Sequence, residues 1–176
     1  MGTAKQPAPV KLVVGMLAPE PEWLARAEEA LEGLYGAIDY RSAVMPFTQT
    51  HYYARELGDP LWRQFVAHAT LIDPGELAAI KVATNALEQA CAVEGRRRVN
   101  LDPGYMALGT FVLATTKDQA HRVYLGQGIY GEVTLAYRDR DWRPWPWTYP
   151  DYRSPEYRTT LREIRARYAA QLKGRT

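Results

Sequence analysis

The sequence has little cysteine, no long apolar run and no strong excess of charge of one sign. Cys91 is the single cysteine, so the chain cannot form an internal disulfide or a multi-thiolate zinc site, and we expect a reducing, cytoplasmic location. No run of about 18 apolar residues and no signal-like N-terminal stretch occurs, which predicts no membrane partner. The net charge of +2 is too small to indicate nucleic-acid binding by itself.

Motifs that would identify a reaction are also missing. No GxxxxGK phosphate loop occurs, and the string GQGIYG lies in an expected hairpin rather than at the start of a helix, where a dinucleotide loop would stand. His51, Asp102, His121 and Glu132 show no HxH or HExxH spacing, so we expect no metal site. The sequence indicates neither a cofactor nor an oligomeric state.

The composition is that of one globular domain. Hydrophobic residues make up 47% and charged residues 24% of the 176 positions, so we expect a flexible tail at residues 1–9 and a single α+β domain at residues 10–176. The 12 Tyr and 5 Trp against 3 Phe suit hydrogen-bonded core positions and also the walls of a cleft.

Apolar spacing predicts the order strand, helix, strand, strand, helix, strand over the first hundred residues. The expected strands are residues 10–17, 38–47, 65–72 and 98–101, and the expected helices run from Glu22 to Gly36 and from Asp73 to Gly95. The compact arrangement for this order is ferredoxin-like, with an antiparallel sheet and both helices on one face.

Further elements follow this core. We expect a strand at residues 110–115, an added β-hairpin with arms at residues 121–125 and 129–137, and a C-terminal helix that begins at Ser154-Pro155. Between them, residues 141–153 (DWRPWPWTYPDYR), the Trp-Pro segment, should be irregular because three prolines interrupt it.

Candidate site residues concentrate in residues 100–134. The string NLDPGY predicts a tight turn, from which Asn100 and Asp102 would project into a cleft, although turn chemistry alone also favours Asp and Gly there. Lys117, His121 and Arg122 could bind a phosphate or carboxylate. The alternative for Arg122 is a cross-strand pair with Glu132.

On the second helix, Lys81, Asn85 and Glu88 form a polar stripe that is either a solvated face or part of the site. The full set of candidates combines a catalytic group and a ligand-binding group. The catalytic candidates are His121, Glu132 and Asp102; the ligand-binding candidates are Asn100, Thr116, Lys117, Arg122, Tyr105, Tyr124, Thr134, Lys81 and Asn85.

Several strings together resemble a conserved bacterial and archaeal family of small proteins of unknown function. They are LVVGML, LIDP with IKVATNALE, VNLDPGYM, VLATTKD with HRVYLGQGIYGEVTL, and WTYPDYR. The resemblance covers nearly the whole chain, and it implies a role shared by the family without naming a reaction.

The leading hypothesis is a site for an anionic or phosphorylated metabolite or nucleotide, where His121, Glu132 or Asp102 moves a proton. An RNA-binding module, with tyrosines that stack on bases, is one alternative. A protein-interaction domain that docks a partner through the Trp-Pro segment is another.

Overall fold

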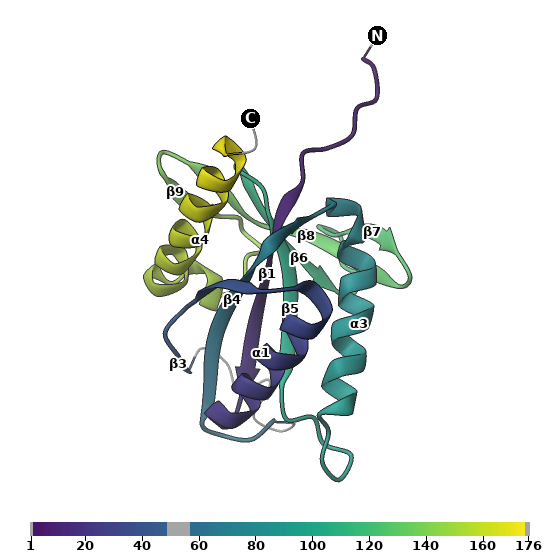
Figure 1. The fold of residues 1–176 in the computed structure, drawn as a ribbon, viewed down its shortest axis with the longest axis vertical. Coiled ribbons are helices and arrows are strands. Elements are labelled where there is room, and N and C mark those ends of the chain that lie inside the picture. The colour runs from purple at the N-terminus through teal and green to yellow at the C-terminus, as the bar shows by residue number, and fades with distance from the viewer. Residues whose placement is uncertain (1, 49–56, 175–176) are drawn as a thin grey trace.

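The computed structural model describes residues 2–48 and 57–174. Within these ranges, nine strands form one sheet against which three α-helices pack (Figure 1). The strands are β1 Val10–Ala18, β2 Ile38–Arg41, β3 Met45–Phe47, β4 Leu61–Ile72, β5 Asn100–Met106, β6 Thr110–Thr115, β7 Val123–Gly126, β8 Ile129–Arg138 and β9 Asp141–Pro144. The helices are α1 Pro21–Tyr35, α3 Leu77–Ala90 and α4 Pro155–Lys173, and 3-10 turns occupy Pro74–Glu76 (η1) and Asp151–Arg153 (η2).

The sheet is antiparallel at each of its strand pairs. Its order is β2-β4-β1-β5-β6-β8-β7, with β3 beside β4 and β9 beside β8. This arrangement confirms the expected α+β class with a large antiparallel sheet. No helix of the described ranges is both long and apolar enough to cross a membrane.

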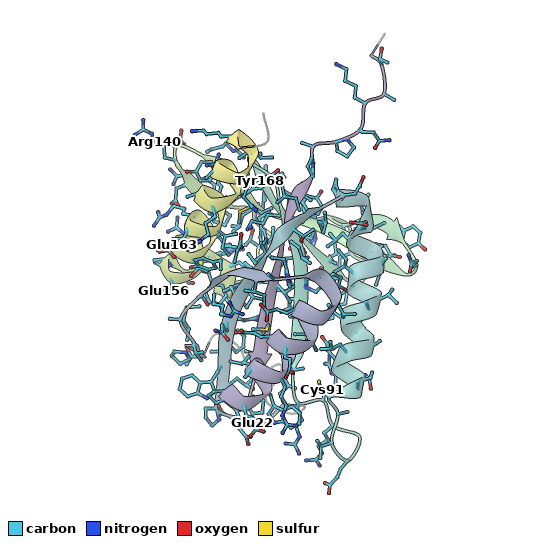
Figure 2. The ribbon with its side chains drawn as sticks, viewed as in Figure 1. Glu22, Cys91, Arg140, Glu156, Glu163 and Tyr168 are labelled. Carbon is cyan, nitrogen blue, oxygen red and sulfur yellow. The ribbon has the colours of Figure 1, made fainter. Side chains whose placement is uncertain are left out.

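Helices α1 and α3 cover one face of the sheet (Figure 1). Alternate residues of β1, beginning with Leu12 and Val14, pack there against Leu24 and Leu31 of α1, as the two-residue period of a strand requires. Cys91, at the end of α3, packs against the same core (Figure 2). A capping box stands where the second helix was expected to begin, because Asp73 accepts from Gly75 N and Glu76 accepts from Asp73 N.

Helix α4 covers the opposite face. Ser154 caps its first turn by accepting from Tyr157 N, and the helix buries Tyr157, Leu161, Ile164 and Tyr168. Trp142 of β9 is fully buried in this core. The side chains of β1 and β4 that face α4 include Val13 and Phe65.

Two local expectations are wrong. Residues 102–104, expected to form a tight turn, lie inside β5, where they pair with β1. The Trp-Pro segment, expected to be irregular, contains β9 and η2. The prolines are tolerated because Pro144 ends a strand that pairs with β8, and Pro150 precedes the first turn of η2.

Candidate functional site

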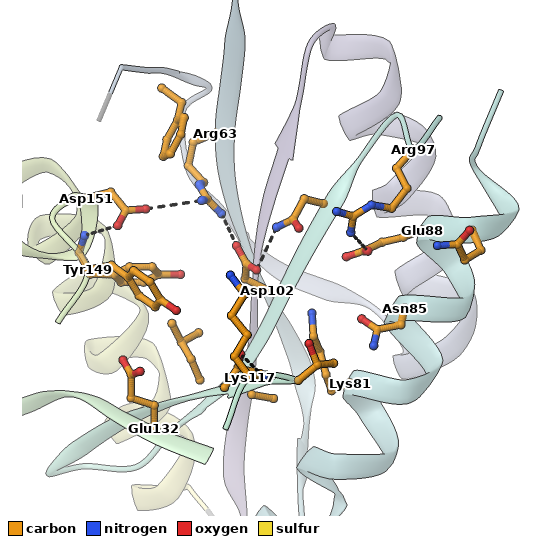
Figure 3. Close-up of a pocket in the computed structure, with 18 of the residues that line it drawn as sticks. Arg63, Lys81, Asn85, Glu88, Arg97, Asp102, Lys117, Glu132, Tyr149 and Asp151 are labelled. Carbon is orange, nitrogen blue, oxygen red and sulfur yellow. Dashed lines mark hydrogen bonds and ion pairs between the residues drawn. The ribbon is translucent and has the colours of Figure 1, made fainter. Parts of the chain in front are cut away.

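The candidate site lies where β5 and β6 separate. These strands pair at Gly104–Leu113, Tyr105–Val112 and Met106–Phe111, whereas residues 100–103 pair with β1 and residues 114–115 pair with β8. A Cβ on Gly104 would lie 2.4 Å from the carbonyl oxygen of Val112, so a glycine is required where the strands come closest. Beyond this point a pocket of about 870 Å³ opens (Figure 3).

The pocket draws its lining from elements far apart in the sequence (Figure 3). Helix α3, the start of β5, the end of β6 and the segment around η2 each contribute, together with Arg63 of β4. A volume of this size matches sites for metabolites and nucleotides, which usually occupy about 300–1,000 Å³. The polar residues of the lining are Arg63, Lys81, Asn85, Glu88, Gln89, Arg97, Asn100, Asp102, Thr115, Thr116, Lys117, Glu132, Tyr149, Asp151 and Tyr152.

Arg63 is the buried centre of one end of the pocket. Its side chain is 2% exposed, and its guanidinium donates from Nη1 to Asp102 Oδ2 at 2.9 Å, while Nη2 lies 3.5 Å from Asp151 Oδ2 (Figure 3). Gly15 leaves room for this group, because a Cβ there would lie 3.0 Å from Arg63 Nη1. One buried cation therefore holds two carboxylates that face the pocket.

The two carboxylates differ in their electrostatic environment. Burial alone would raise the pKa of Asp102, but the charges of Arg63 and Lys81 and a hydrogen bond from Asn100 outweigh it and hold that pKa below its usual value. Burial raises the pKa of Asp151, and the neighbouring charge of Asp102 adds to the increase against the attraction of Arg63. Asp102 is thus the more readily ionised of the two.

Helix α3 forms the other wall. Lys81 Nζ donates to the carbonyl oxygen of Leu101 at 2.7 Å, and Glu88 accepts from Leu101 N at 2.6 Å. Glu88 also pairs with Arg97. Lys81 and Glu88 are buried, so the interpretation of this stripe as a solvated face is wrong for these two residues. Burial raises the pKa of Glu88, against the opposing charges of Lys81 and Arg97.

Tyr152 places an unsatisfied polar atom beside the pocket. Its side chain is 2% exposed, and its hydroxyl has no hydrogen-bond partner among the residues that the structure describes. Burial raises the pKa of this phenol, so the hydroxyl keeps its proton at neutral pH and remains a donor. A buried hydroxyl without a partner is costly, and this one lies beside Gly15 at the Arg63 end of the pocket.

His121, Arg122 and Glu132 form a hydrogen-bonded cluster behind one wall. Glu132 Oε2 accepts from Arg122 Nε at 2.9 Å and contacts His121 Nε2 at 3.0 Å, which confirms the expected contact between Arg122 and Glu132. Arg122 also donates to the carbonyl oxygen of Lys117 and to the Tyr149 hydroxyl. His121 stacks on Trp147 with ring centroids 5.4 Å apart. Glu132 lines the pocket, and the other two side chains lie behind it.

The structure brings most of the predicted site residues together. The predicted residues that line the pocket are Lys81, Asn85, Asn100, Asp102, Thr116, Lys117 and Glu132. Three others lie elsewhere. Tyr105 packs beside Leu77 and Ala78, Tyr124 is exposed on β7, and Thr134 is buried at a bulge in β8. His51 lies outside the described residues.

Sequence reasoning missed Arg63, Arg97 and Asp151. A lone arginine inside the apolar start of β4 is the signal that could have identified Arg63, because a buried charge needs partners. Asp151 lies in the Trp-Pro segment, which was expected to be irregular. Among the described residues, no three His, Cys, Asp or Glu side chains are placed together to hold a metal ion.

Comparison with known proteins gives a family without an assigned activity. No curated protein and no solved structure is significantly similar to this chain. The model of a domain of unknown function, DUF4416, matches residues 8–168. This match confirms the resemblance to an uncharacterised family that the strings indicate. The chain belongs to the DUF4416 family.

Proposed function

We propose that the pocket binds a small anionic or phosphorylated metabolite or nucleotide. The observation that carries the proposal is the presence of Lys81 from α3 and Lys117 from the loop after β6 in the lining of one pocket of suitable size. Lys81 and Lys117 supply donors for ligand oxygens, while Asn85, Asn100 and Thr116 supply further hydrogen-bonding groups.

Acid–base catalysis is a further part of the proposal. Asp102 and Glu132 are the predicted catalytic residues that line the pocket, and Asp102 is held ionised by Arg63. His121 contacts the pocket through Glu132, so its role would be to hold or protonate that carboxylate. Asp151, whose pKa is raised, is a better proton donor than Asp102 at the same end.

The scaffold of the site is proposed to be ferredoxin-like. The elements β1, α1, β2, β4, α3 and β5 follow the required order, and their strands lie as β2-β4-β1-β5 with antiparallel neighbours. Both helices pack on one face. In this proposal β6 to β9 and α4 are additions to the core. The single cysteine supports a cytoplasmic location.

The two alternatives have weaker support. Base stacking on a sheet needs an open face, but α1 and α3 cover one face and α4 covers the other around β1. In the Trp-Pro segment, Trp142 is fully buried, and Trp145 and Trp147 stack on each other at 5.3 Å. These contacts use the tryptophans within the chain, so RNA and protein partners remain secondary to a small ligand.

Thermal unfolding in the presence of a ligand panel tests the proposal. The panel pairs phosphorylated metabolites and nucleotides with their dephosphorylated counterparts. A ligand at about 100 times its Kd should raise the Tm by roughly 5–10 °C. We expect stabilisation by a phosphorylated member, its loss in Lys117→Met, and its retention in Lys5→Met, which changes a lysine of the exposed tail. Equal Tm shifts by the phosphorylated and the dephosphorylated member of every pair would contradict an anion site.

A further inference from the structure

Tyr149 is an exposed aromatic side chain in the wall of the pocket. Its residue is 39% exposed, although neighbouring Tyr152 and Asp151 are buried. Packing of the core therefore does not account for the place of this ring. In Figure 3 it lies on the side of the pocket that also holds Asp151 and Glu132.

Arg122 fixes the Tyr149 ring in position. Its Nη2 donates to the Tyr149 hydroxyl at 2.7 Å, its Nη1 donates to the carbonyl oxygen of Lys117 at 2.9 Å, and its Nε donates to Glu132 at 2.9 Å. The Arg122 side chain is itself only 2% exposed, and of its three hydrogen bonds the one to the buried Glu132 carboxylate is the best shielded from water. A buried arginine thus ties an exposed ring to the same wall that carries Lys117.

We infer that the ligand of this pocket carries a planar ring, aromatic or heteroaromatic, which packs on Tyr149 while its anionic group lies toward Lys117. The inference rests on the proposed anion site and specifies the rest of the ligand. Tyrosine loses little conformational entropy on binding, and a ring already held in place loses less. Any flat group can stack on such a ring. The carboxamides of Asn85 and Gln89, in the same lining, can contact the edge of a heterocycle.

Equilibrium binding to matched phosphates tests this inference. The ring-bearing probes are adenosine 5′-monophosphate, uridine 5′-monophosphate and phenyl phosphate, which carry a planar ring. The comparison probe is ribose 5-phosphate, which carries only its non-planar sugar ring. Calorimetric titration should give at least one ring-bearing probe a Kd roughly tenfold below that of ribose 5-phosphate. Tyr149→Leu should remove this advantage and leave ribose 5-phosphate within about twofold, since only the stacking contact is lost.

Two control variants separate the ring from other effects. Tyr149→Phe keeps the ring and loses the hydroxyl, so it should retain most of the advantage. Tyr124→Leu removes a tyrosine that is 60% exposed on β7 and lies outside the pocket, so it should change no Kd. Equal binding of every ring-bearing probe and ribose 5-phosphate would overturn the inference, as would an equal loss for both kinds of probe in Tyr149→Leu. Failure of all four phosphates to bind would instead contradict the anion site itself.

Discussion

At the scale of single residues, the pocket depends on side chains that are small or absent. Gly104 lets β5 and β6 approach at the point where they part, and Gly15 leaves space for the Arg63 guanidinium. Pro103 precedes Gly104 and has no N–H for a neighbouring strand. Residues close together in the sequence therefore determine where β5 and β6 separate.

Adding one methyl group at Gly104 should therefore lower the free energy of unfolding. In Gly104→Ala, Cβ would meet the backbone oxygen of Val112 at 2.4 Å, and backbone cannot move aside as a side chain can. We expect a loss of about 1–3 kcal/mol in urea denaturation. Gly109→Ala, in the same hairpin but with no atom within 4 Å of the new Cβ, is the control and should change stability by less than about 0.5 kcal/mol. Equal losses in both variants would refute the role of Gly104.

Asp102 and Asp151 both contact Arg63, but their charges should have opposite effects on the free energy of unfolding as the pH changes. The pKa of Asp102 is lowered in the folded state, so its charge stabilises the fold above about pH 3.8 and this contribution is lost as the pH falls through the lowered pKa. Asp102→Asn should thus be less stable than wild type at pH 7, with a difference that shrinks in acid. The free energy of unfolding, measured from pH 7 to pH 3, reports this difference.

The charge of Asp151 should lower the free energy of unfolding, whereas that of Asp102 raises it. Its pKa is raised in the folded state, so its ionisation at neutral pH favours the unfolded chain. Asp151→Asn, which keeps the Oδ1 acceptor for Tyr152 N, should be at least as stable as wild type at pH 7, and any gain should disappear as Asp151 becomes protonated in acid. A strong loss of stability at pH 7 would show that the Arg63–Asp151 pair outweighs burial.

At the scale of elements, the apolar spacing of a helix predicts only part of its packing. In α1, Leu31 is fully buried and Leu34 is 54% exposed, although both belong to the apolar repeat of the sequence. Leu31→Ala should cost about 2–5 kcal/mol of unfolding free energy because it leaves a cavity under the helix. Leu34→Ala should cost less than about 0.5 kcal/mol. Similar losses in thermal or urea unfolding would contradict the observed orientation of α1.

Helices and short apolar strands were predictable because their signals are local. Helix starts were predicted at Asp73 and at Ser154-Pro155, and both residues, Asp73 and Ser154, accept capping hydrogen bonds in the structure. The strand at residues 110–115 was placed correctly for the same reason. Local signals failed in β5, because Asp-Pro-Gly favours a turn unless neighbouring strands hold it extended, as β1 does here.

At the scale of the whole molecule, the site was predictable only in part. Seven of the predicted residues line the pocket, since polar groups near strand ends were correctly expected to gather. Arg63 and Asp151 are 88 positions apart in the numbering of the chain and meet only because η2 packs against β4. The apolar periodicity of neither segment indicates that Arg63 and Asp151 meet.

The pocket as a whole balances its charges among its own residues. Asp151, Arg63 and Asp102 form one ion-paired group, and Glu88 with Arg97 forms another beside Lys81. Buried ion pairs contribute little to stability on balance, because the cost of removing charge from water offsets their attraction. Their concentration around one cavity supports the proposed ligand site.

A crystal structure grown with the most stabilising phosphorylated ligand of the panel tests this account most directly. The account predicts that the ligand occupies the 870 Å³ pocket, with its anionic group within hydrogen-bonding distance of Lys81 or Lys117 and its remaining part near Asp102 and Tyr149. Ligand bound anywhere outside the pocket, or bound in the pocket with its anionic group turned away from both lysines, would contradict it.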